Sequence, residues 1–467
     1  MTKKFIKIED LWSETEGFLF KDTQFTREET MCDQAWNYVQ FLPQRNAVNY
    51  CCRTSPLELT DQDIEEQGTE IFWNPKHVVQ RRKDMLAGKR SEDCHTCWKL
   101  EVNGLQSKRT YKNIIPELRK THPSLPANTK LDNNDIPWQD FYTSKSTKSI
   151  EIILGNTCDS KCVYCSDYFS SLWAQEKRKY GEEVYLTWEN DFDSKLVKVF
   201  WEYFEEAWPT LPHINFIGGE PLVMKDFFKY LDRILEIAER VPAVPTLEAP
   251  VKKGLSIVTN GNTPSHLLDR FLTYSEKLSK YFYVHVQISG ENVGEQLEYV
   301  RFGTTWKQWS ENVERYITST HVDAQFLPAV QLLSLPSMSH YIDFIIEMFI
   351  KHKKTIRLHW ASVSWPHEFS LDFIPLEILP YIDQCLDSLD LLYYMSETDD
   401  QKKSVEYFVK SLKLVRTLGV EQNKHMLDDK EWCINFKKFF DKLDERRGTT
   451  WWETFPEFAM IKEITNV

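Results

Sequence analysis

The chain has 467 residues and a formal net charge of -13, with 57 lysine and arginine residues against 70 acidic residues. This length allows two or three domains, and the excess of acidic side chains argues against extended nucleic-acid binding because it repels phosphates. Hydrophobic residues make up 42% of the chain and aromatic residues 14%, which is typical of a globular protein and excludes a largely disordered one.

Neither a secretory signal nor a membrane-spanning helix is expected. The lysines of the first ten residues have no apolar stretch behind them, and no run of about 18 uncharged apolar residues follows anywhere. Two short basic runs, 81–83 and 177–179, are expected to be solvated helix faces. We therefore expect a cytoplasmic protein without nucleic-acid or membrane partners, in which ten cysteines favour metal binding over disulfides.

The expected first domain, residues 1–112, contains five cysteines, namely Cys32, Cys51, Cys52, Cys94 and Cys97. The last two form a C-x2-C pair, which occurs both in zinc sites and in iron–sulfur sites. Adjacent side chains rarely face the same small metal centre, so the choice between Cys51 and Cys52 stays open. Residues 113–147 are polar and interrupted by prolines, which is typical of a linker.

From residue 148 to residue 370, short apolar runs alternate with helical patterns. The expected strands are 150–154, 213–217, 255–259, 283–289, 324–332 and 355–363, and the expected helices are 192–208, 227–240, 266–278 and 338–352. Such alternation predicts parallel pairing, and six units predict a partial (β/α)6 TIM-like barrel. Residues 371–467 carry helical patterns at 402–418 and 428–447 and are expected to form a C-terminal helical cap.

Three cysteines stand directly behind the first expected strand, in the order C-x3-C-x2-C: Cys158, Cys162 and Cys165. Three thiolates can hold a cubane of four irons and leave one iron open for another ligand. A zinc knuckle that lacks its fourth ligand, or thiols packed in a core, are the alternatives. In parallel barrels the chemistry gathers at the carboxyl ends of the strands, which is where this triplet lies.

Glycine-rich and polar sequences follow the next strands. The second strand ends in Gly218, Gly219, Glu220 and Pro221, the third in Thr259, Asn260 and Gly261, and the fourth in Gln287, Ile288 and Ser289. Two glycines allow the backbone to approach a ligand closely, and a glutamate can accept a hydrogen bond from an ammonium group.

Together these motifs resemble the core of radical S-adenosylmethionine (SAM) enzymes, over roughly residues 148–365. The resemblance implies a 4Fe–4S cluster bound by the three cysteines and by SAM, which is cleaved reductively to methionine and a 5′-deoxyadenosyl radical. It implies that Tyr164 shields the cluster and that Val363 contacts the adenine of SAM. The amino group of SAM is expected to contact Gly218, Gly219, Glu220 and Pro221, and its ribose and carboxylate are expected to contact Asn260, Ser289 and Arg301.

The first-domain cysteines resemble the auxiliary-cluster modules called SPASM or twitch, here placed before the barrel instead of after it. In this resemblance Cys32, Cys51, Cys94 and Cys97 bind a second 4Fe–4S cluster, and Asn46 occupies a turn where glycine is usual. Zinc is the alternative metal for this set. Glu101, Gly104, Ser107 and Arg109 also resemble the twitch sequence.

The resemblance predicts an enzyme that modifies a peptide or protein, with a sugar or nucleotide metabolite as the alternative substrate. A flavodoxin or ferredoxin is expected to donate the electron. A non-catalytic zinc or iron–sulfur scaffold is the competing function. The substrate, the outcome of the radical step and the oligomeric state are not predicted by the sequence.

Overall fold

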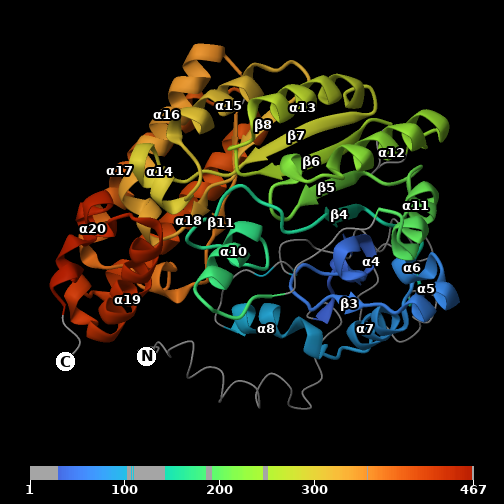
Figure 1. Ribbon diagram of the computed structural model, residues 1–467, viewed down its shortest axis with the longest axis horizontal. Helices are drawn as coiled ribbons and strands as arrows, with labels where there is room; N and C mark the ends of the chain where they lie inside the picture. The colour runs from blue at the N-terminus through green and yellow to red at the C-terminus, as the bar shows by residue number, and fades with distance from the viewer. Residues whose placement is uncertain are drawn as a thin grey trace, which may run out of the picture. The chain divides into compact units, whose positions relative to one another are not determined.

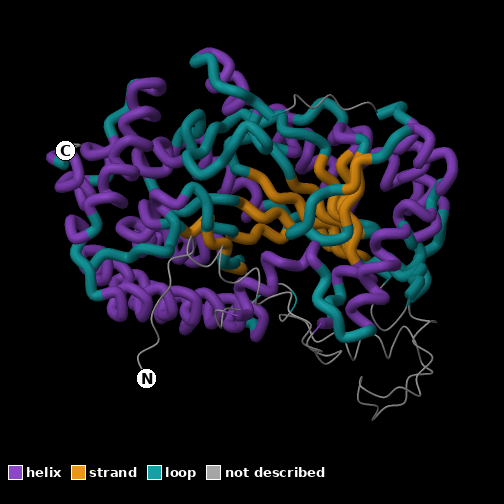
Figure 2. Tube along the Cα trace, turned by 90° about the horizontal axis from the view of Figure 1, so that it is seen from below, coloured by secondary structure: helices purple, strands orange, loops and turns teal. Residues whose placement is uncertain are grey.

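The computed structural model describes residues 30–102, 107, 109, 142–185, 192–245, 251–354 and 356–464. The contacts divide the chain into two compact units. The first comprises Met1–Leu154, Trp188–Asn215 and Tyr230–Lys253, and the second comprises Gly155–Thr187, Phe216–Lys229 and Gly254–Val467. Helices take up more of the described chain than strands (Figure 2). The predicted domain boundaries stay predictions, and positions 113–141 of the predicted linker lie outside the described residues.

The strands of the first unit lie in the order β4-β1-β2-β3. β1 (Tyr38–Leu42) pairs in parallel with β4 (Ser149–Ile153) and antiparallel with β2 (Ala47–Asn49). β2 in turn pairs antiparallel with β3 (Leu57–Glu58). Between β1 and β2 the chain turns at Asn46, which has a left-handed φ of 49°. Asparagine tolerates this conformation, as the sequence indicates, and its side-chain amide donates to the carbonyl of Leu59 at 2.5 Å.

Two helices of the first unit, α6 (Glu70–Trp73) and α11 (Lys195–Ala207), pack aromatic side chains against β1. The unit also contains α4 (Gln34–Asn37), α5 (Asp61–Gln67), α7 (Lys76–Leu86), α8 (His95–Val102) and most of α12 (Phe227–Arg240). Phe41 of β1 stacks on Phe200 of α11 with ring centroids 3.9 Å apart, and Phe72 stacks on Tyr203 at 4.7 Å. These stacked rings form the centre of the first unit's core.

β5 (His213–Ile217) and β6 (Lys253–Thr259) begin in the first unit and end in the second. In the second unit the strands lie in the order β6-β7-β8-β10, where β8 (Asp323–Phe326) pairs in parallel with both β7 (Phe282–Ile288) and β10 (Arg357–Leu358). β9 (Ala329–Val330) and β11 (Ala361–Ser362) form a separate parallel pair. The mixed α/β fold with parallel strands is therefore confirmed.

Two expected strands, 324–332 and 355–363, are each broken in two. The break in the first falls at Pro328, whose nitrogen has no hydrogen to donate to a sheet. Because β8 pairs with β10 and β9 pairs with β11 in the same register, the break repeats at residues 359–360 of the partner strand.

The predicted helices of the second unit are present close to their expected bounds, as α13 (Ser265–Leu278) and α16 (Met338–His352). α13 packs on β7 and α15 (Trp306–Thr318) packs on β8 (Figure 1). The remaining helices of this unit are α10 (Ser171–Lys179), α14 (Gly294–Val300), α17 (Leu379–Met395), α18 (Asp399–Gln422), α19 (Lys430–Arg447) and α20 (Trp451–Thr454).

The C-terminal region is helical, as expected: α18 contains the first predicted helix, α19 begins two residues later than the second predicted helix and ends with it, and α17 precedes both. No helix in the described ranges combines the length and the apolar character that crossing a lipid bilayer requires.

Candidate functional site

The cysteine triplet lies in a loop of the second unit that backbone and side-chain hydrogen bonds hold in place. The amides of Lys161 and Val163 donate to the carbonyls of Phe302 and Val300, each at 2.8 Å. The indole of Trp173, on α10, donates to the carbonyl of Cys162 at 2.8 Å. The loop is thus fixed on both sides of Cys162.

All three thiols are at least half-buried, and burial raises the pKa of each: to about 12 for Cys165, and above the ordinary value for Cys158 and Cys162. The proximity of Cys162 raises the pKa of the other two further, so Cys162 lies within electrostatic reach of both Cys158 and Cys165. A buried thiolate is costly without a compensating positive charge, and iron supplies that charge. The three-thiolate donor set therefore fits an iron–sulfur cluster.

Asn260, which follows β6, reaches the same loop. Its side-chain amide donates to Asp159 at 2.6 Å and to Ser160 at 3.1 Å, and lies 3.8 Å from the sulfur of Cys158. Asn262 adds a bond to the carbonyl of Gly303 at 3.0 Å. The end of β6 therefore fixes the position of the first cysteine.

The turn after β5 approaches the segment before Cys158 through its backbone. The amide of Gly219 donates to the carbonyl of Gly155 at 3.1 Å, and the amide of Glu220 donates to that of Thr157 at 2.8 Å. A methyl group at Gly219 would overlap the carbonyl oxygen of Thr157, so glycine is required there. Gly218 has a φ of 122°, and Pro221 starts a short 3-10 helix.

Glu220 is fully buried, and its carboxylate holds the ends of β5 and β6 together. It accepts from the amide of Asn260 at 2.7 Å, from the hydroxyl of Thr259 at 3.0 Å and from the amide of Leu222 at 3.2 Å. Burial, assisted by the nearby Asp159, raises the pKa of Glu220 to about 8. Both oxygens thus have protein donors, and the predicted contact of this side chain with SAM stays a prediction.

Tyr164, Glu291 and Arg301 form a buried network beside Cys162. The hydroxyl of Tyr164 donates to Glu291 at 2.9 Å, and Arg301 forms an ion pair with Glu291 at 2.8 Å. Another nitrogen of Arg301 lies 4.0 Å from the sulfur of Cys162. The side chains of Arg301 and Glu291 are only 3% and 1% exposed. Arg301 therefore acts on the cluster loop directly, in addition to the SAM contact predicted for it.

The other predicted contacts lie at strand ends. The amide of Ser289 donates to the carbonyl of Thr259 at 2.8 Å, so Ser289 is adjacent to the Asn260 turn. Val363 follows β11, and its amide donates to the carbonyl of Val330 at 2.9 Å. Sequence reasoning missed Asp159 and Glu291. Their only sequence signal is their position, next to Cys158 and two residues after Ser289.

The cysteines of the first unit also come together. Burial raises the pKa of the Cys32 thiol, and the nearby Cys94 and Cys97 raise it further. Burial raises the pKa of Cys94 to about 11. The pKa of Cys51 is raised by a hydrogen bond with Cys52, by burial and, to a smaller extent, by Cys32. Cys51 is half-buried whereas Cys52 is exposed, which favours Cys51 as the ligand.

Arg109 links α8, which carries Cys97, to the segment of Cys32. It forms an ion pair with Glu101, donates to the carbonyl of Met31 at 3.2 Å, and lies over the ring of Trp98 at 4.1 Å. Ser107 also donates to Glu101 at 2.5 Å. Gly104 lies outside the described residues. These contacts hold two of the cysteine-bearing segments together.

Within the described ranges, no three His, Cys, Asp or Glu side chains converge tightly enough to hold a single metal ion. A cubane requires a different arrangement, because each of its cysteines binds a different iron.

A polar band crosses β7, β8 and β10 on one face of the sheet. His285 donates to Asp323 at 2.8 Å, Gln325 donates to Asp323 at 2.8 Å, and His359 bonds to Gln325 at 2.8 Å. Arg357 forms an ion pair with Asp323. His285 is thus hydrogen-bonded within the sheet. Tyr283, on the same strand face, is 54% exposed, although parallel sheets are normally covered on both faces.

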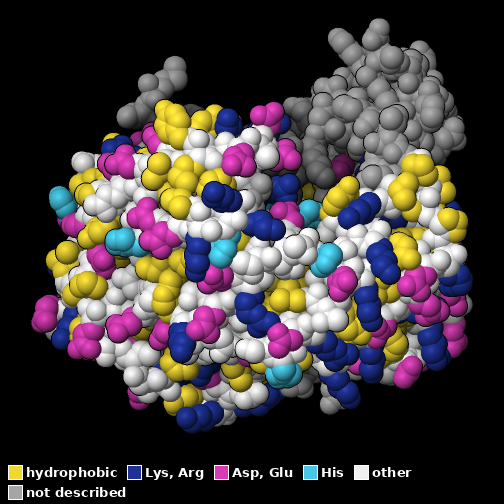
Figure 3. Space-filling view, turned by 90° about the horizontal axis from the view of Figure 1, so that it is seen from above, with side chains coloured by type: hydrophobic (Ala, Val, Ile, Leu, Met, Phe, Trp, Pro, Cys, Tyr) yellow, Lys and Arg dark blue, Asp and Glu magenta, His cyan; other side chains and the backbone are white. Residues whose placement is uncertain are grey.

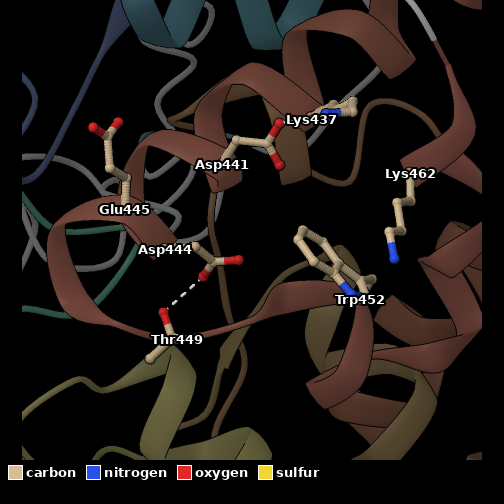
Figure 4. Close-up of a pocket in the computed structure, with 7 residues that line it drawn as sticks. All are labelled: Lys437, Asp441, Asp444, Glu445, Thr449, Trp452 and Lys462. Carbon is tan, nitrogen blue, oxygen red and sulfur yellow. Dashed lines mark hydrogen bonds and ion pairs between the residues drawn. The ribbon is translucent and has the colours of Figure 1, made fainter.

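Two surface hollows lie elsewhere in the second unit. One, of about 450 Å³, is formed by α19 and the residues after it, where Thr449 donates to Asp444 at 2.6 Å (Figure 4). The other, of about 520 Å³, lies between α14 and α20 and is lined by Glu295, Glu298 and Glu453. Neither contains a predicted site residue. On the face drawn in Figure 3, acidic and basic side chains are interspersed.

Comparison with known proteins gives one family. The sequence model of the Radical SAM superfamily matches residues 152–321, which include the cysteine triplet, Glu220, Asn260 and Arg301. No curated protein matches the chain in sequence. The match confirms the resemblance that the motifs indicate.

Several solved structures are similar to the chain at low identity. Streptococcus suis SuiB bound to S-adenosylmethionine is 13% identical, with a TM-score of 0.30 over 66% of this chain and 58% of SuiB. SuiB bound to the precursor peptide SuiA is 13% identical, with a TM-score of 0.28 over the same shares. The cobalamin-dependent S-adenosylmethionine radical enzyme OxsB is 13% identical, with a TM-score of 0.32 over 70% of this chain and 55% of OxsB. The chain thus matches less than two thirds of the length of these proteins, and its resemblance to the Radical SAM superfamily rests on the sequence match of residues 152–321.

Proposed function

Because residues 152–321 form a radical SAM domain, we propose that the chain is an enzyme that cleaves SAM reductively and uses the resulting 5′-deoxyadenosyl radical to modify a substrate. One observation carries the proposal. Cys162 is buried and lies within electrostatic reach of the half-buried Cys158 and Cys165, in a loop bonded to the ends of the strands that carry the other predicted contacts.

The protein contributes ligands, position and exclusion of water. Cys158, Cys162 and Cys165 bind a 4Fe–4S cluster, which when bound supplies the electron that cleaves SAM. Asn260 orients the loop at Cys158, and the backbone of Gly218 and Gly219 offers a close approach to the amino group of SAM. The buried thiol of Cys162 and the half-buried thiols of Cys158 and Cys165 would limit the access of water to the cluster.

We further propose that Cys32, Cys51, Cys94 and Cys97 bind a second 4Fe–4S cluster in the first unit. Cys32 lies near Cys94 and Cys97, and Cys51 is half-buried whereas Cys52 is exposed, which supports this set over one with Cys52. The second cluster would serve as an electron relay or as an anchor for the substrate. Zinc at this position is the alternative that metal analysis decides.

The substrate that we propose is a peptide or protein, because relatives with a comparable cysteine module often act on such substrates. The polar band of His285, Asp323 and Arg357 supports a substrate with hydrogen-bonding groups, since it is a partly exposed strand face inside a parallel sheet. A cytoplasmic location and a flavodoxin or ferredoxin as electron donor complete the proposal.

Electron paramagnetic resonance of the anaerobically reconstituted and reduced protein tests this function. We expect a cluster signal that changes when SAM is added, because SAM binds the open iron. The change should persist in Cys32→Ala and in Cys385→Ala, which removes an isolated buried cysteine of α17, and should vanish in Cys162→Ala. A protein that binds zinc and no iron would instead be a metal scaffold, and would contradict the proposal.

A further inference from the structure

We propose that the last turn of α10, together with the aromatic side chains around it, is the docking surface for an acidic protein that delivers single electrons to the cluster of Cys158, Cys162 and Cys165. This inference rests on the proposed function, because only a redox-active cluster requires a donor. It gives a role to residues 177–179, which the sequence indicates only as a solvated helix face.

The first turn of α10 is bonded directly to the cluster loop. Ser170, which caps the helix, donates from its hydroxyl to the carbonyl of Ser160 at 2.7 Å. The amide of Cys158 donates to the hydroxyl of Ser171 at 3.3 Å, and Trp173 donates to the carbonyl of Cys162 at 2.8 Å. A nine-residue helix is about 13 Å long, so its basic end lies a short distance from the cysteines.

The last turn of α10 is basic and exposed. Arg178 and Lys179 are exposed, and Lys177 forms an ion pair with the buried Asp167 at 2.7 Å. The nearby Glu182 is already paired with Lys442 and Arg446 of α19, which leaves Glu183 as the adjacent acidic residue in the described part of the segment, up to residue 185. This turn is therefore locally positive in a chain whose net charge is -13.

Exposed aromatic side chains precede and follow α10 in the chain. Phe169 is 40% exposed, Tyr180 is 41% exposed and Tyr185 is 65% exposed. Tyr168 holds Phe169 and Tyr185 in ring contacts of 4.6 and 6.0 Å. Aromatic residues and arginine are enriched at protein–protein interfaces, whereas isolated solvated helix faces carry no such cluster.

Charge decides the kind of partner. An acidic carrier is repelled by the chain as a whole and attracted by the turn of Arg178 and Lys179, so electrostatic steering brings it to this face. In the transfer the carrier is oxidised by one electron and the cluster is reduced by one electron. No bond forms or breaks in this step, and the oxidised carrier then leaves the surface.

Stopped-flow reduction of the reconstituted cluster, followed by its visible absorbance, tests the surface. The variant Arg178→Glu with Lys179→Glu is compared with Lys410→Glu with Lys413→Glu, which makes the same change in net charge at two exposed lysines of α18. Each protein is reduced either with a reduced flavodoxin or with dithionite, at low and at high salt. Iron content and circular dichroism check that each variant is folded and loaded.

We expect reduction by flavodoxin to slow about tenfold at low salt in the α10 variant, to change less than twofold in the α18 variant, and to lose its salt dependence only in the α10 variant. Dithionite should reduce all three proteins equally. Equal slowing in both variants, or a wild-type cluster that dithionite reduces and flavodoxin does not, would overturn the docking surface. A wild-type cluster that neither reductant reduces would overturn the proposed function and the docking surface with it.

Discussion

Arg301 and Glu291 show how a buried neighbour changes what a charged residue does. By sequence Arg301 is a contact of the SAM carboxylate, and it carries a full positive charge. In the structure one guanidinium nitrogen of Arg301 forms an ion pair with the carboxylate of Glu291 at 2.8 Å, while another nitrogen lies 4.0 Å from the sulfur of Cys162. The pair is nearly neutral as a whole, so the cluster experiences a dipole instead of a free cation.

Replacing Glu291 by glutamine should therefore expose the charge of Arg301 to the cluster. We expect the midpoint potential of the cluster to become more positive in Glu291→Gln, because the reduced cluster carries more negative charge. Breaking the buried pair should also lower the free energy of unfolding by about 3 kcal/mol. A redox titration followed by electron paramagnetic resonance measures the potential. Tyr164→Phe, which removes only a hydrogen bond to Glu291, is the control and should shift it less.

The adjacent cysteines of the first unit allow a second test at the residue scale. Cys51 is half-buried and lies near enough to Cys32 for that thiol to raise its pKa slightly, whereas Cys52 is exposed. With two cubanes the protein should bind about eight irons per chain, and Cys51→Ser should bind about four. Cys52→Ser should keep about eight, and serves as the matched control. Loss of iron in Cys52→Ser but not in Cys51→Ser would show that the ligand is the other cysteine.

At the scale of elements, β6 begins with a buried lysine. The ammonium group of Lys253 donates to the carbonyls of Leu211 at 2.7 Å and Pro209 at 3.3 Å, and it lies over the ring of Trp208 at 4.8 Å. None of these partners carries a negative charge. Burial therefore lowers the pKa of Lys253 to about 8, from the 10.5 of a free lysine.

The stability of the protein should depend on pH through this lysine. Between about pH 8 and 10.5 the unfolded chain binds the proton that the folded chain has lost, so the free energy of unfolding rises with pH by at most about 3 kcal/mol, and below pH 8 that gain is absent. Lys253→Met should lose this rise. Urea unfolding of both proteins at several pH values measures the difference, and parallel curves would contradict the assignment.

Local sequence predicts the bounds of an element well where its hydrophobic periodicity is strong, and poorly where those bounds depend on the strand with which it pairs. α12, α13 and α16 start and end within a residue of their expected bounds, because their apolar positions recur at three and four. The strands after β7 are shorter than expected, since Pro328 interrupts one strand and the register carries the break to its partner. The break between β10 and β11 has no signal in its own sequence, because it follows from the pairing of these strands with β8 and β9.

The same distinction holds for the candidate site. The cysteine triplet and the glycine turn are visible in the sequence because their spacing is local. Asp159 and Glu291 were missed because they act through contacts with Asn260 and Arg301 that only the fold creates. Glu220 was identified, but its three protein donors could not be foreseen.

At the scale of the whole molecule, each unit contains its own set of cysteines. Cys158, Cys162 and Cys165 belong to the second unit, and the five N-terminal cysteines belong to the first. The first unit also takes in Trp188–Asn215 and Tyr230–Lys253, which are distant in sequence from its cysteines. Residue spacing could predict two cysteine sets, but a linear sequence could not predict this interleaving, because it follows from contacts between distant segments.

The formation of 5′-deoxyadenosine tests the central claim most directly. The anaerobically reconstituted protein is incubated with SAM and a low-potential reductant, and the product is quantified by chromatography. We expect product from the wild-type protein and from Cys385→Ala, and only background from Cys162→Ala, because the cluster loop loses a ligand. An iron-loaded wild-type protein that forms no 5′-deoxyadenosine, or a Cys162→Ala variant that forms as much as the wild type, would contradict the account.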